Sequence, residues 1–534
     1  MVKSKNTPKK LEIYDTTLRD GCQAEGIQFS TPDKIEFTQI LDDFGIAYIE
    51  GGWPGSNPSA IAYFKEIQKV ELKNIKVAAF GSTRRAKISP AKDPNIKALL
   101  DANVPVVTIF GKSWDMHVTD ALRVPLKENL KMIEESVSYL LSKKKEVVYD
   151  AEHFFDGFKK NKDYAIETIA AAIKGGAKTL ALCDTNGGTL PLEIESILIE
   201  IKSEFPNSNF GIHAHNDSGV AIANTLTAIN CGSSHIQGVM NGFGERCGNV
   251  NLITVIAITA LKMGIKSIKP SKIKKLQYLS KIVDEFANQE NDKRAPFIGA
   301  SAFAHKGGIH VSAVQRNSAC YEHIDPALVG NRQRILLSEQ SGRSNIHQIA
   351  ESAGINLKKH EGLDKLLLKR IKELEETGYE FEGALASFEL IMDDLLEKRQ
   401  HYFEPKGFRV IGENRDNNSI AEATVKVSVN GTEHLAVSEG NGPVNALDQA
   451  LRNALRPFFP GIDKIYLQDY KVRVFSQKRA TASRVRVLIT SKIKGENSWS
   501  TVGVSEDIIE ASWEALLDSI SYAFKKYKHL ILKK

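Results

Sequence analysis

Residues 11–44 read LEIYDTTLRDGCQAEGIQFSTPDKIEFTQILDDF and form the first unit of a pattern that recurs along the chain. A short run typical of a β-strand comes first, a polar, glycine-bearing segment follows, and an amphipathic stretch completes the unit. Pro32 stands near the start of that stretch, where its fixed φ angle favours the first turn of a helix. A strand followed by a helix is the repeating element of parallel sheets, so this unit predicts parallel pairing with its neighbours.

The same pattern returns until about residue 265 and predicts a closed barrel. Strands are predicted at Leu11–Tyr14, Ala47–Glu50, Lys76–Phe80, Val104–Phe110, Glu146–Tyr149, Thr179–Cys183, Asn209–His213 and His235–Met240. Helices are predicted at Pro32–Phe44, Pro58–Glu71, Pro94–Ala102, Pro125–Leu141, Asp163–Lys174, Pro191–Glu204, Ser218–Asn230 and Asn249–Met263. Eight strand–helix units in roughly 250 residues match the α/β class and the (β/α)8 TIM barrel. An open doubly wound sheet is the structural alternative, but it would more often show fewer strands and a phosphate-binding glycine motif after the first strand, which this sequence lacks.

Charged and polar residues gather where the predicted strands end and the helices begin. In chain order they include Asp15, Arg19, Asp20, Glu50, Arg84, Arg85, Lys112, Asp150, Glu152, His153, Asp184, Thr185, His213, His215, Asp217, Asn241, Glu245, Arg246 and Asn249. In a TIM barrel the active site lies at this end of the strands. Buried strands do not need this much charge, so its concentration predicts an active site there.

A metal site is predicted from two histidines that end the seventh strand, His213 and His215. Side chains two residues apart in a strand share a face, so both imidazoles point into the barrel mouth and suit a divalent first-row metal. Asp20 joins them because the first, seventh and eighth strands meet where the ring closes, and Asn249 can add an amide oxygen. Such a set leaves open positions for a chelating 2-oxo acid, as a catalytic metal requires. Taken alone, a His-x-His pair is more commonly packed or hydrogen-bonded than metal-binding.

Three further residues at this rim have both a catalytic and a structural interpretation. Arg19 is permanently charged and planar, so it can stabilise a developing oxyanion, or it can form a salt bridge to Asp15 or Glu50. Glu152 is a candidate general base, or a carboxylate that orients a metal ligand. Thr185 can hydrogen-bond a substrate carboxylate, or it can cap the next helix.

The composition excludes several function classes. The 534 residues are 25% charged and 42% hydrophobic with a net charge of +6, which is typical of a soluble globular protein and too dilute for a nucleic-acid surface. No apolar window reaches the roughly 18 residues of a membrane span. The glycine motif at residues 242–248 lacks the dinucleotide-binding spacing, so no nicotinamide cofactor is expected. The five scattered cysteines without CxxC pairing indicate a reducing cytoplasm.

The sequence beyond the barrel changes character twice. The predicted domains are a disordered tail at residues 1–10, the TIM barrel at 11–270, helical linker and lid subdomains at 271–400, and an α+β domain at 401–534. The last part shows an internal duplication of a strand–strand–helix unit. It has few clustered histidine, cysteine or acidic residues, so a ligand-binding or dimerising module fits it better than a second catalytic domain.

Three motifs together resemble the DRE-type TIM-barrel metallolyase superfamily. They are Asp15-Thr16-Thr17-Leu18-Arg19-Asp20-Gly21, His213-x-His215-Asn216-Asp217 and Gly242-x-Gly244-Glu245-Arg246-x-Gly248-Asn249. The resemblance continues through residues 302–310 and into the C-terminal duplication, which is similar to the regulatory (LeuA-type allosteric) domain of 2-isopropylmalate and citramalate synthases. It therefore covers nearly the whole chain and points to the alpha-isopropylmalate/homocitrate synthase family.

Finer motifs resemble one subgroup of this family, the citramalate synthases. These motifs are Gly52-Trp53-Pro54-Gly55-Ser56-Asn57-Pro58, Phe80-Gly81-Ser82-Thr83-Arg84-Arg85 and Asp184-Thr185-Asn186-Gly187-Gly188. Isopropylmalate synthases usually carry Asp-Thr-Val-Gly at the third motif and a glutamate where Cys22 stands. The subgroups differ in a pocket for one substrate side chain, where one or two carbons are worth only about 1–3 kcal/mol, so few residues can switch the preference.

The resemblance also implies residue roles. The metal ligands of the family fall on Asp20, His213, His215 and Asn249, with Mg²⁺ or Mn²⁺ as the implied ion and Zn²⁺ admitted by the imidazoles. The oxyanion-stabilising arginine falls on Arg19, and pocket positions that contact the 2-oxo acid or the acetyl group fall on Glu152 and Thr185. His310 and, more loosely, Tyr321 resemble the histidine and tyrosine of a lid segment that completes the acetyl-CoA site.

The activity implied by the resemblance is a metal-dependent Claisen-type condensation of acetyl-CoA with pyruvate, with thioester hydrolysis to (R)-citramalate and CoA. Glu152 or His310 would be the base. The reaction opens the pyruvate route to isoleucine, and the C-terminal domain implies a homodimer that isoleucine inhibits. The alternatives within the family are 2-isopropylmalate synthase, with 2-oxoisovalerate as substrate and leucine as inhibitor, and homocitrate synthase. An alternative from another class is a non-enzymatic amino-acid sensor on an inactive barrel.

Overall fold

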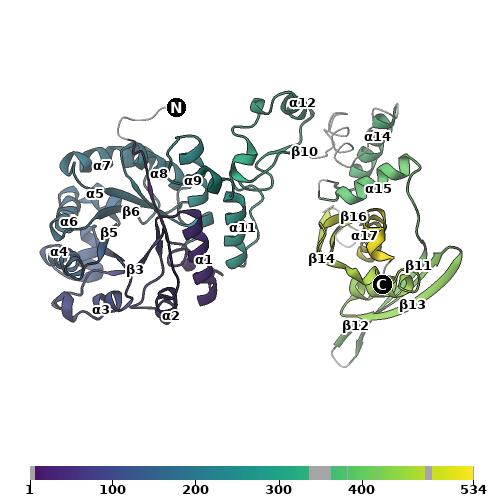
Figure 1. Cartoon of the computed structure of the whole chain (residues 1–534), viewed down its shortest axis with the longest axis horizontal. Coiled ribbons are helices and arrows are strands. Elements are labelled where there is room, and N and C mark those ends of the chain that lie inside the picture. Colours follow the sequence, from purple (N-terminus) through teal and green to yellow (C-terminus); the bar gives the residue numbers. More distant parts are fainter. Residues whose placement is uncertain (1–6, 336–361, 382, 416–417, 476–483, 533–534) are drawn as a thin grey trace. The chain divides into compact units, whose positions relative to one another are not determined.

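The computed structural model describes residues 7–335, 362–381, 383–415, 418–475 and 484–532 (Figure 1). The chain divides into two compact units. The first comprises Met1–Phe303 and Ile324–Arg332, and the second comprises Ala304–His323 and Gln333–Lys534. The predicted domain boundaries at residues 10, 270 and 400 stay predictions.

The first unit is built on a closed barrel of eight parallel strands in chain order, which confirms the predicted TIM barrel. The strands are β1 (Glu12–Asp15), β2 (Tyr48–Glu50), β3 (Lys76–Ser82), β4 (Val106–Lys112), β5 (Glu146–Glu152), β6 (Thr179–Asp184), β7 (Phe210–Ala214) and β8 (His235–Gly238). The ring closes between β1 and β8, where Tyr14 stands opposite Gln237. This closure brings the ends of β1, β7 and β8 together at one side of the rim.

Helices follow every strand and cover the outside of the barrel (Figure 1). They are α1 (Thr31–Phe44), α2 (Pro58–Ile67), α3 (Pro94–Asp101), α4 (Leu126–Ser142), α5 (Phe154–Lys160), α6 (Lys162–Gly175), α7 (Pro191–Glu204), α8 (Ala221–Asn230) and α9 (Leu252–Leu261). Helix α1 illustrates why they form: Ser30 and Asp33 make a reciprocal capping box at its start, and Gly45 ends it with a φ of 99°. The predicted helices are confirmed with small shifts at their ends.

Two helical segments at the rim lie outside the predicted pattern. One is α5, and the other is a π-helical turn at His117–Leu122. Helix α5 starts directly from His153, whose backbone is left-handed (φ 54°) and whose side chain makes no capping hydrogen bond. Its seven residues bury Phe154, Phe155 and Phe158 on one face, but it is short and has no capping signature to reveal it.

The core of the first unit has two shells. A large apolar layer fills the space between the strands and the surrounding helices. A smaller layer fills the barrel lumen and contains Tyr14, Tyr48, Ala78, Val106 and Val148. Helices α10 (Pro270–Ile273) and α11 (Leu276–Phe286) extend the outer layer, because Leu276, Leu279 and Val283 are buried in it.

The second unit begins with short elements and two helices. They are β9 (Ala304–His305), α12 (Gly308–Arg316), β10 (Arg334–Ile335), α14 (Leu363–Glu376) and α15 (Leu385–Leu395). Strands β9 and β10 pair in parallel. Helices α14 and α15 share an apolar cluster that includes Leu367, Ile371, Phe388 and Val502.

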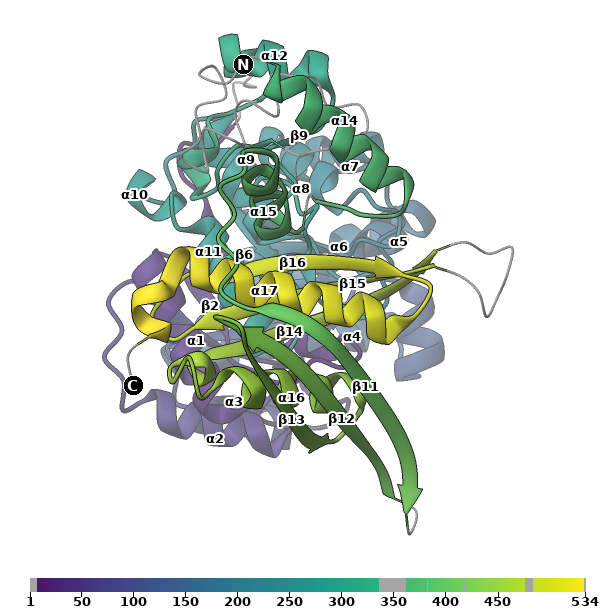
Figure 2. The same ribbon diagram turned by 90° about the vertical axis from the view of Figure 1, so that its right-hand side faces the viewer.

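The C-terminal duplication is confirmed, and each copy contains one strand more than predicted. Two three-stranded antiparallel sheets are each followed by a helix (Figure 2). The first copy is β11 (Glu404–Arg415), β12 (Asn418–Val429), β13 (Thr432–Gly440) and α16 (Pro443–Leu455). The second is β14 (Ile465–Phe475), β15 (Arg484–Ile493), β16 (Trp499–Ser505) and α17 (Ile508–Ile531). The two copies share one apolar cluster. In the described part of the chain, no helix combines the length and hydropathy that crossing a membrane requires.

Candidate metal centre

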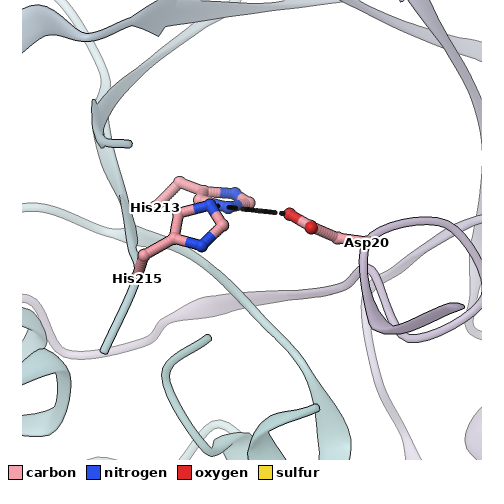
Figure 3. A group of neighbouring side chains, drawn as sticks. All are labelled: Asp20, His213 and His215. Atoms are coloured by element: carbon pink, nitrogen blue, oxygen red, sulfur yellow. Dashed lines mark ion pairs between the residues drawn. The ribbon is translucent and has the colours of Figure 1, made fainter. Parts of the chain in front are cut away.

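Three side chains predicted as metal ligands converge at the rim of the barrel (Figure 3). His213 belongs to β7, and His215 is the residue directly after that strand. Asp20 stands in the turn after β1. Asp20 Oδ2 lies 3.1 Å from His213 Nε2 and 3.9 Å from His215 Nε2. One donor atom from each residue fits within a span of 4.8 Å, and all three residues are buried. The geometry therefore suits a shared cation.

The charges of these three side chains depend on one another. Burial would raise the pKa of the Asp20 carboxyl, but Arg19 and His213 outweigh burial and hold this pKa well below its usual range. Burial disfavours the charged form of His213, yet the hydrogen bond to Asp20 raises the pKa of His213. Burial and the neighbouring His213 lower the pKa of His215 to about 4. One anionic carboxylate therefore faces two imidazoles, of which His215 is neutral at neutral pH.

Asn249 supplies an unpaired oxygen beside this group. Its backbone forms an isolated β-bridge with His215, and its Nδ2 donates to the carbonyl of Phe243 at 3.3 Å. Its Oδ1 is buried and has no hydrogen-bond partner among the described residues. Gly244 must lack a side chain, because a Cβ there would lie 2.2 Å from Asn249 Nδ2. Buried polar atoms are normally paired, so the orphaned oxygen fits a cation ligand.

Arg19 lies next to the candidate ligands and makes the salt bridge that was the structural alternative. Its Nε donates to Glu50 Oε2 at 2.5 Å, and its Nη1 lies 3.2 Å from Asp20 Oδ2. Its guanidinium carbon lies 3.8 Å from the ring centroid of Phe80. Glu50 is fully buried and also accepts a hydrogen bond from the hydroxyl group of Tyr14 at 2.7 Å. Arg19 is thus held in one orientation from two sides, and it lines the pocket.

Glu152 and Thr185 also line the pocket. The Glu152 carboxylate forms an ion pair with Lys112, from the end of the neighbouring strand. Thr185 Oγ1 accepts the backbone N–H of His153 at 2.9 Å, which differs from the predicted alternative of capping the next helix. Because this contact uses a lone pair of the hydroxyl oxygen, the hydroxyl hydrogen is available to a substrate oxygen.

The pocket is small and has one aromatic wall. Its volume is about 200 Å³. The wall consists of Trp53, Phe80 and Phe110, with ring centroids 5.5–5.7 Å apart. Asp20 and the two histidines also line the pocket. An anionic ligand with a short apolar substituent matches this combination of charge and shape.

Sequence reasoning missed two polar residues behind the histidines. Gln237 Oε1 lies 2.8 Å from His213 Nδ1, and Gln237 Nε2 donates to Asp150 Oδ1 at 2.8 Å. Burial, with the nearby Glu50 carboxylate, raises the pKa of Asp150 to about 7. Asp150 was recognised only as a polar residue after a strand. Gln237 could have been found from strand register, because it stands opposite His213.

His310 and Tyr321 belong to the second compact unit. Their rings stack with centroids 4.1 Å apart and an angle of 24° between the planes. Their predicted part in an acetyl-CoA site stays a prediction.

Comparisons with known proteins agree with this arrangement. The HMGL-like family model matches residues 10–283, the model described as homocitrate synthase post-HMGL domain-like matches 297–379, and the LeuA allosteric (dimerisation) domain matches 382–524. The (R)-citramalate synthase of Geobacter sulfurreducens is 51% identical over 97% of this chain and 98% of that protein. The (R)-citramalate synthase of Aquifex aeolicus is 50% identical over the same shares of both chains. A 2-isopropylmalate synthase of Methanocaldococcus jannaschii is 29% identical over 98% of this chain and 96% of that protein.

These matches confirm the family resemblance found in the motifs. They extend over the barrel, the middle segment and the C-terminal duplication, so they do not depend on the rim motifs alone. The chain therefore belongs to the HMGL-like family, in the branch whose members also contain a LeuA allosteric (dimerisation) domain.

Proposed function

We propose that this chain is an acyltransferase that condenses acetyl-CoA with pyruvate and hydrolyses the thioester to give (R)-citramalate and CoA. The observation that supports it most is the buried set of Asp20, His213 and His215 beside the unpaired oxygen of Asn249. The high identity to two (R)-citramalate synthases over nearly their whole length gives the substrate class.

Asp20, His213, His215 and Asn249 would hold a divalent cation through one carboxylate, two imidazole nitrogens and one amide oxygen. Oxygen ligands favour Mg²⁺ or Mn²⁺, and the imidazoles also admit Zn²⁺. When bound, such a cation supplies a Lewis acid that polarises the keto group of a 2-oxo acid. The donor set leaves positions open for that substrate.

Side chains around the pocket have separate tasks in this proposal. Arg19, fixed by Glu50, presents its remaining donors to the oxygen that becomes negative when the carbon–carbon bond forms. Thr185 donates its hydroxyl hydrogen to the substrate carboxylate. The aromatic wall of Trp53, Phe80 and Phe110 excludes water and surrounds the methyl group of pyruvate.

The reaction needs a base for the methyl group of acetyl-CoA. Glu152 or His310 takes one of its protons, and the resulting carbanion equivalent forms a bond with the keto carbon of pyruvate. The new alkoxide gains a proton, and water cleaves the thioester with CoA as the leaving group. Glu152 shares its carboxylate with Lys112 through one oxygen, and the second oxygen keeps acceptor sites for a proton.

The C-terminal domain gives the proposal a regulatory part. A LeuA allosteric (dimerisation) domain indicates a dimer that binds an effector, and isoleucine, the end product of the pyruvate route, is the proposed inhibitor. Removal of residues 382–534 should leave some catalysis and abolish inhibition by isoleucine. Inhibition that persisted in the truncated chain would show that the effector binds elsewhere.

None of the five cysteines forms a disulfide, which supports a reducing cytoplasm as the compartment.

Thiol release from acetyl-CoA tests the activity directly. Pyruvate, 2-oxobutyrate, 2-oxoisovalerate and 2-oxoglutarate are compared side by side, with and without a chelator. We expect turnover with pyruvate that the chelator abolishes and a divalent cation restores. Preference for 2-oxoisovalerate or 2-oxoglutarate would instead favour 2-isopropylmalate or homocitrate synthase. The absence of turnover with every acid would favour a non-enzymatic sensor.

A further inference from the structure

The two histidines of the candidate metal centre are held differently. His213 and Gln237 are register partners on the neighbouring parallel strands β7 and β8. Register partners point to the same side of a sheet, so both side chains enter the barrel lumen, where both are buried. Gln237 Oε1 lies 2.8 Å from His213 Nδ1. By contrast, His215 Nδ1 is buried and has no hydrogen-bond partner among the described residues.

The orientation of the Gln237 amide decides which nitrogen of His213 holds the hydrogen. A neutral imidazole has one donor and one acceptor nitrogen. If the amide oxygen faces Nδ1, then Nδ1 donates and Nε2, the atom 3.1 Å from Asp20, is free to bind a cation. If the amide were turned over, its NH2 group would require an acceptor at Nδ1, and the hydrogen would move to Nε2.

Asp150 fixes that orientation from across the lumen. It stands on β5, and its Oδ1 accepts a hydrogen bond from Gln237 Nε2 at 2.8 Å. An ionised carboxylate can only accept, so when Asp150 is ionised the NH2 end of the amide faces Asp150 and the oxygen end faces His213. All three residues are at most 5% exposed, so water has little access to replace either bond.

We propose that Asp150 and Gln237 form a positioning relay that holds His213 in the tautomer able to bind a cation. The proposal rests on the proposed function, because it concerns the same metal centre. Neither residue needs to touch the cation or the substrate. Partners of metal-binding histidines tune affinity, typically by 10–100-fold. A competing explanation is that the two residues only satisfy each other's buried polar atoms, and affinity for the cation distinguishes the two explanations.

The experiment measures the dissociation constant of Mn²⁺ for the metal-free full-length chain by electron paramagnetic resonance, with no substrate present. Gln237→Met keeps the length of the side chain and removes both hydrogen bonds. We expect this variant to bind Mn²⁺ about 10–100-fold more weakly than the wild type. Thr225→Val is the matched control, since it also removes a buried polar atom but lies on α8, where its hydroxyl has no partner among the described residues. Its affinity should stay within about twofold of the wild type.

Exchanging the carboxylate and the amide between positions 150 and 237 tests the orientation of the Gln237 side chain. In Asp150→Asn two amides face each other, so both can turn over, and we expect Mn²⁺ to bind several-fold more weakly. Adding Gln237→Glu restores one direction, because the amide introduced at position 150 can only donate to the new carboxylate and the carboxylate can only accept from His213. The double variant should therefore bind Mn²⁺ as tightly as the wild type, a rescue that mere packing does not predict.

The outcomes separate the relay from the metal centre. A wild type that binds neither Mn²⁺ nor Zn²⁺ would refute the proposed centre. A wild type that binds, together with a folded Gln237→Met variant of equal affinity, would refute the relay alone. If Gln237→Met does not fold, the comparison between Asp150→Asn and the double variant decides, and a double variant no tighter than Asp150→Asn overturns the relay.

Discussion

The two ends of the barrel are both rich in charge, but they use it differently. At the N-terminal end, Glu146 is the first residue of β5 and contacts two lysines and a tyrosine. Its carboxylate lies 2.7 Å from Lys76 Nζ and 2.8 Å from Lys178 Nζ, and it accepts a hydrogen bond from the hydroxyl of Tyr48 at 2.7 Å. The charge of Glu146 is therefore compensated within the fold, as expected of the end of a TIM barrel that contributes stability. At the same end, Glu12 Oε2 lies 3.6 Å from His235 Nδ1, and neither atom has a hydrogen-bond partner among the described residues.

At the C-terminal end, the charged and polar groups are buried but incompletely paired. Asn249 Oδ1 and His215 Nδ1 have no hydrogen-bond partner among the described residues, and Asp20 shares one oxygen among Arg19 and two imidazoles. Unpaired buried polar atoms are costly and persist where a ligand completes them. The difference teaches that neither charge nor an unpaired buried atom at a strand end marks a site by itself, whereas unpaired groups that converge on one carboxylate beside a pocket do.

The largest effect is expected when the shared carboxylate of Asp20 is removed from the C-terminal end of the barrel. Asp20→Ala should lower turnover of acetyl-CoA and pyruvate by on the order of 10⁴-fold, because the cation site loses its anionic ligand. The change also takes a buried partner from Arg19 and His213, so some loss of stability is expected, and circular dichroism checks that the variant is folded. Thiol release and Mn²⁺ binding measure the effect. Undiminished metal-dependent activity would eliminate the proposed centre.

A smaller loss is expected when the cation ligands are kept and Arg19 is changed. Arg19→Gln removes the permanent charge that faces the pocket and should lower kcat about 10²–10³-fold. Binding of Mn²⁺ to the apo enzyme should not weaken as it does in Asp20→Ala, because the proposed ligands remain and a neighbouring positive charge is removed. Steady-state kinetics with pyruvate as the varied substrate separate kcat from KM. A change confined to KM would assign Arg19 to ground-state binding and contradict the oxyanion role.

The ligand set was predictable because it follows from strand geometry. His213 and His215 share a face by the period of two, and Asp20 reaches them because β1 and β7 both border β8 in the closed ring. The barrel itself was predictable from the alternation of strand and helix patterns. The third strand in each C-terminal copy was missed. The sequence of β11 has no clear alternation of apolar and polar residues, and the alternation of β14 is interrupted by a register shift between Leu467 and Asp469.

Long-range polar partners could not be predicted. Gln237 and Asp150 are 87 positions apart in the chain, and no local pattern links a single glutamine to a distant aspartate. The ion pair of Lys112 with Glu152 was missed for another reason. These two residues are register partners at the ends of β4 and β5, whereas the predicted strands stopped two and three residues earlier, which placed both side chains in loops.

A substitution at the N-terminal end of the barrel should change the stability of the protein and leave its activity unchanged. Glu146→Gln removes the carboxylate from its two lysines and should destabilise the fold by about 1 kcal/mol, because solvent screens part of the interaction. The apparent Tm should fall by about 1–2 °C, and kcat/KM should stay within about twofold of the wild type. Burial would raise the pKa of Glu146, but Lys178, Lys76 and Tyr48 outweigh it and lower this pKa to about 2. The loss should therefore be full at pH 7 and shrink only below about pH 4.5, where the unfolded carboxylate takes up its proton.

The smallest expected effect is a change in the pH dependence of stability at His235, which is fully buried between the rings of Tyr14 and Tyr48. Burial lowers the pKa of His235 despite the nearby carboxylate of Glu12. The unfolded histidine therefore takes up a proton at a higher pH than the folded one, and the folded state loses stability as the pH falls through about 6.5. His235→Gln cannot titrate, so denaturant unfolding at pH 7.0 and pH 5.5 should show a smaller loss of stability on acidification in the variant than in the wild type.

Only the difference between the wild type and His235→Gln is informative here. Other groups titrate in the same pH range and change the stability in the opposite direction. Burial raises the pKa of Asp15 and of Asp150 to about 7. These carboxyl groups keep their protons longer in the folded state, so they favour folding as the pH falls. They remain in the variant and cancel when the two slopes are subtracted. Equal pH dependence of stability in the wild type and in His235→Gln would mean that His235 binds a proton without unfolding. Burial would then not keep this side chain neutral at the N-terminal end of the barrel.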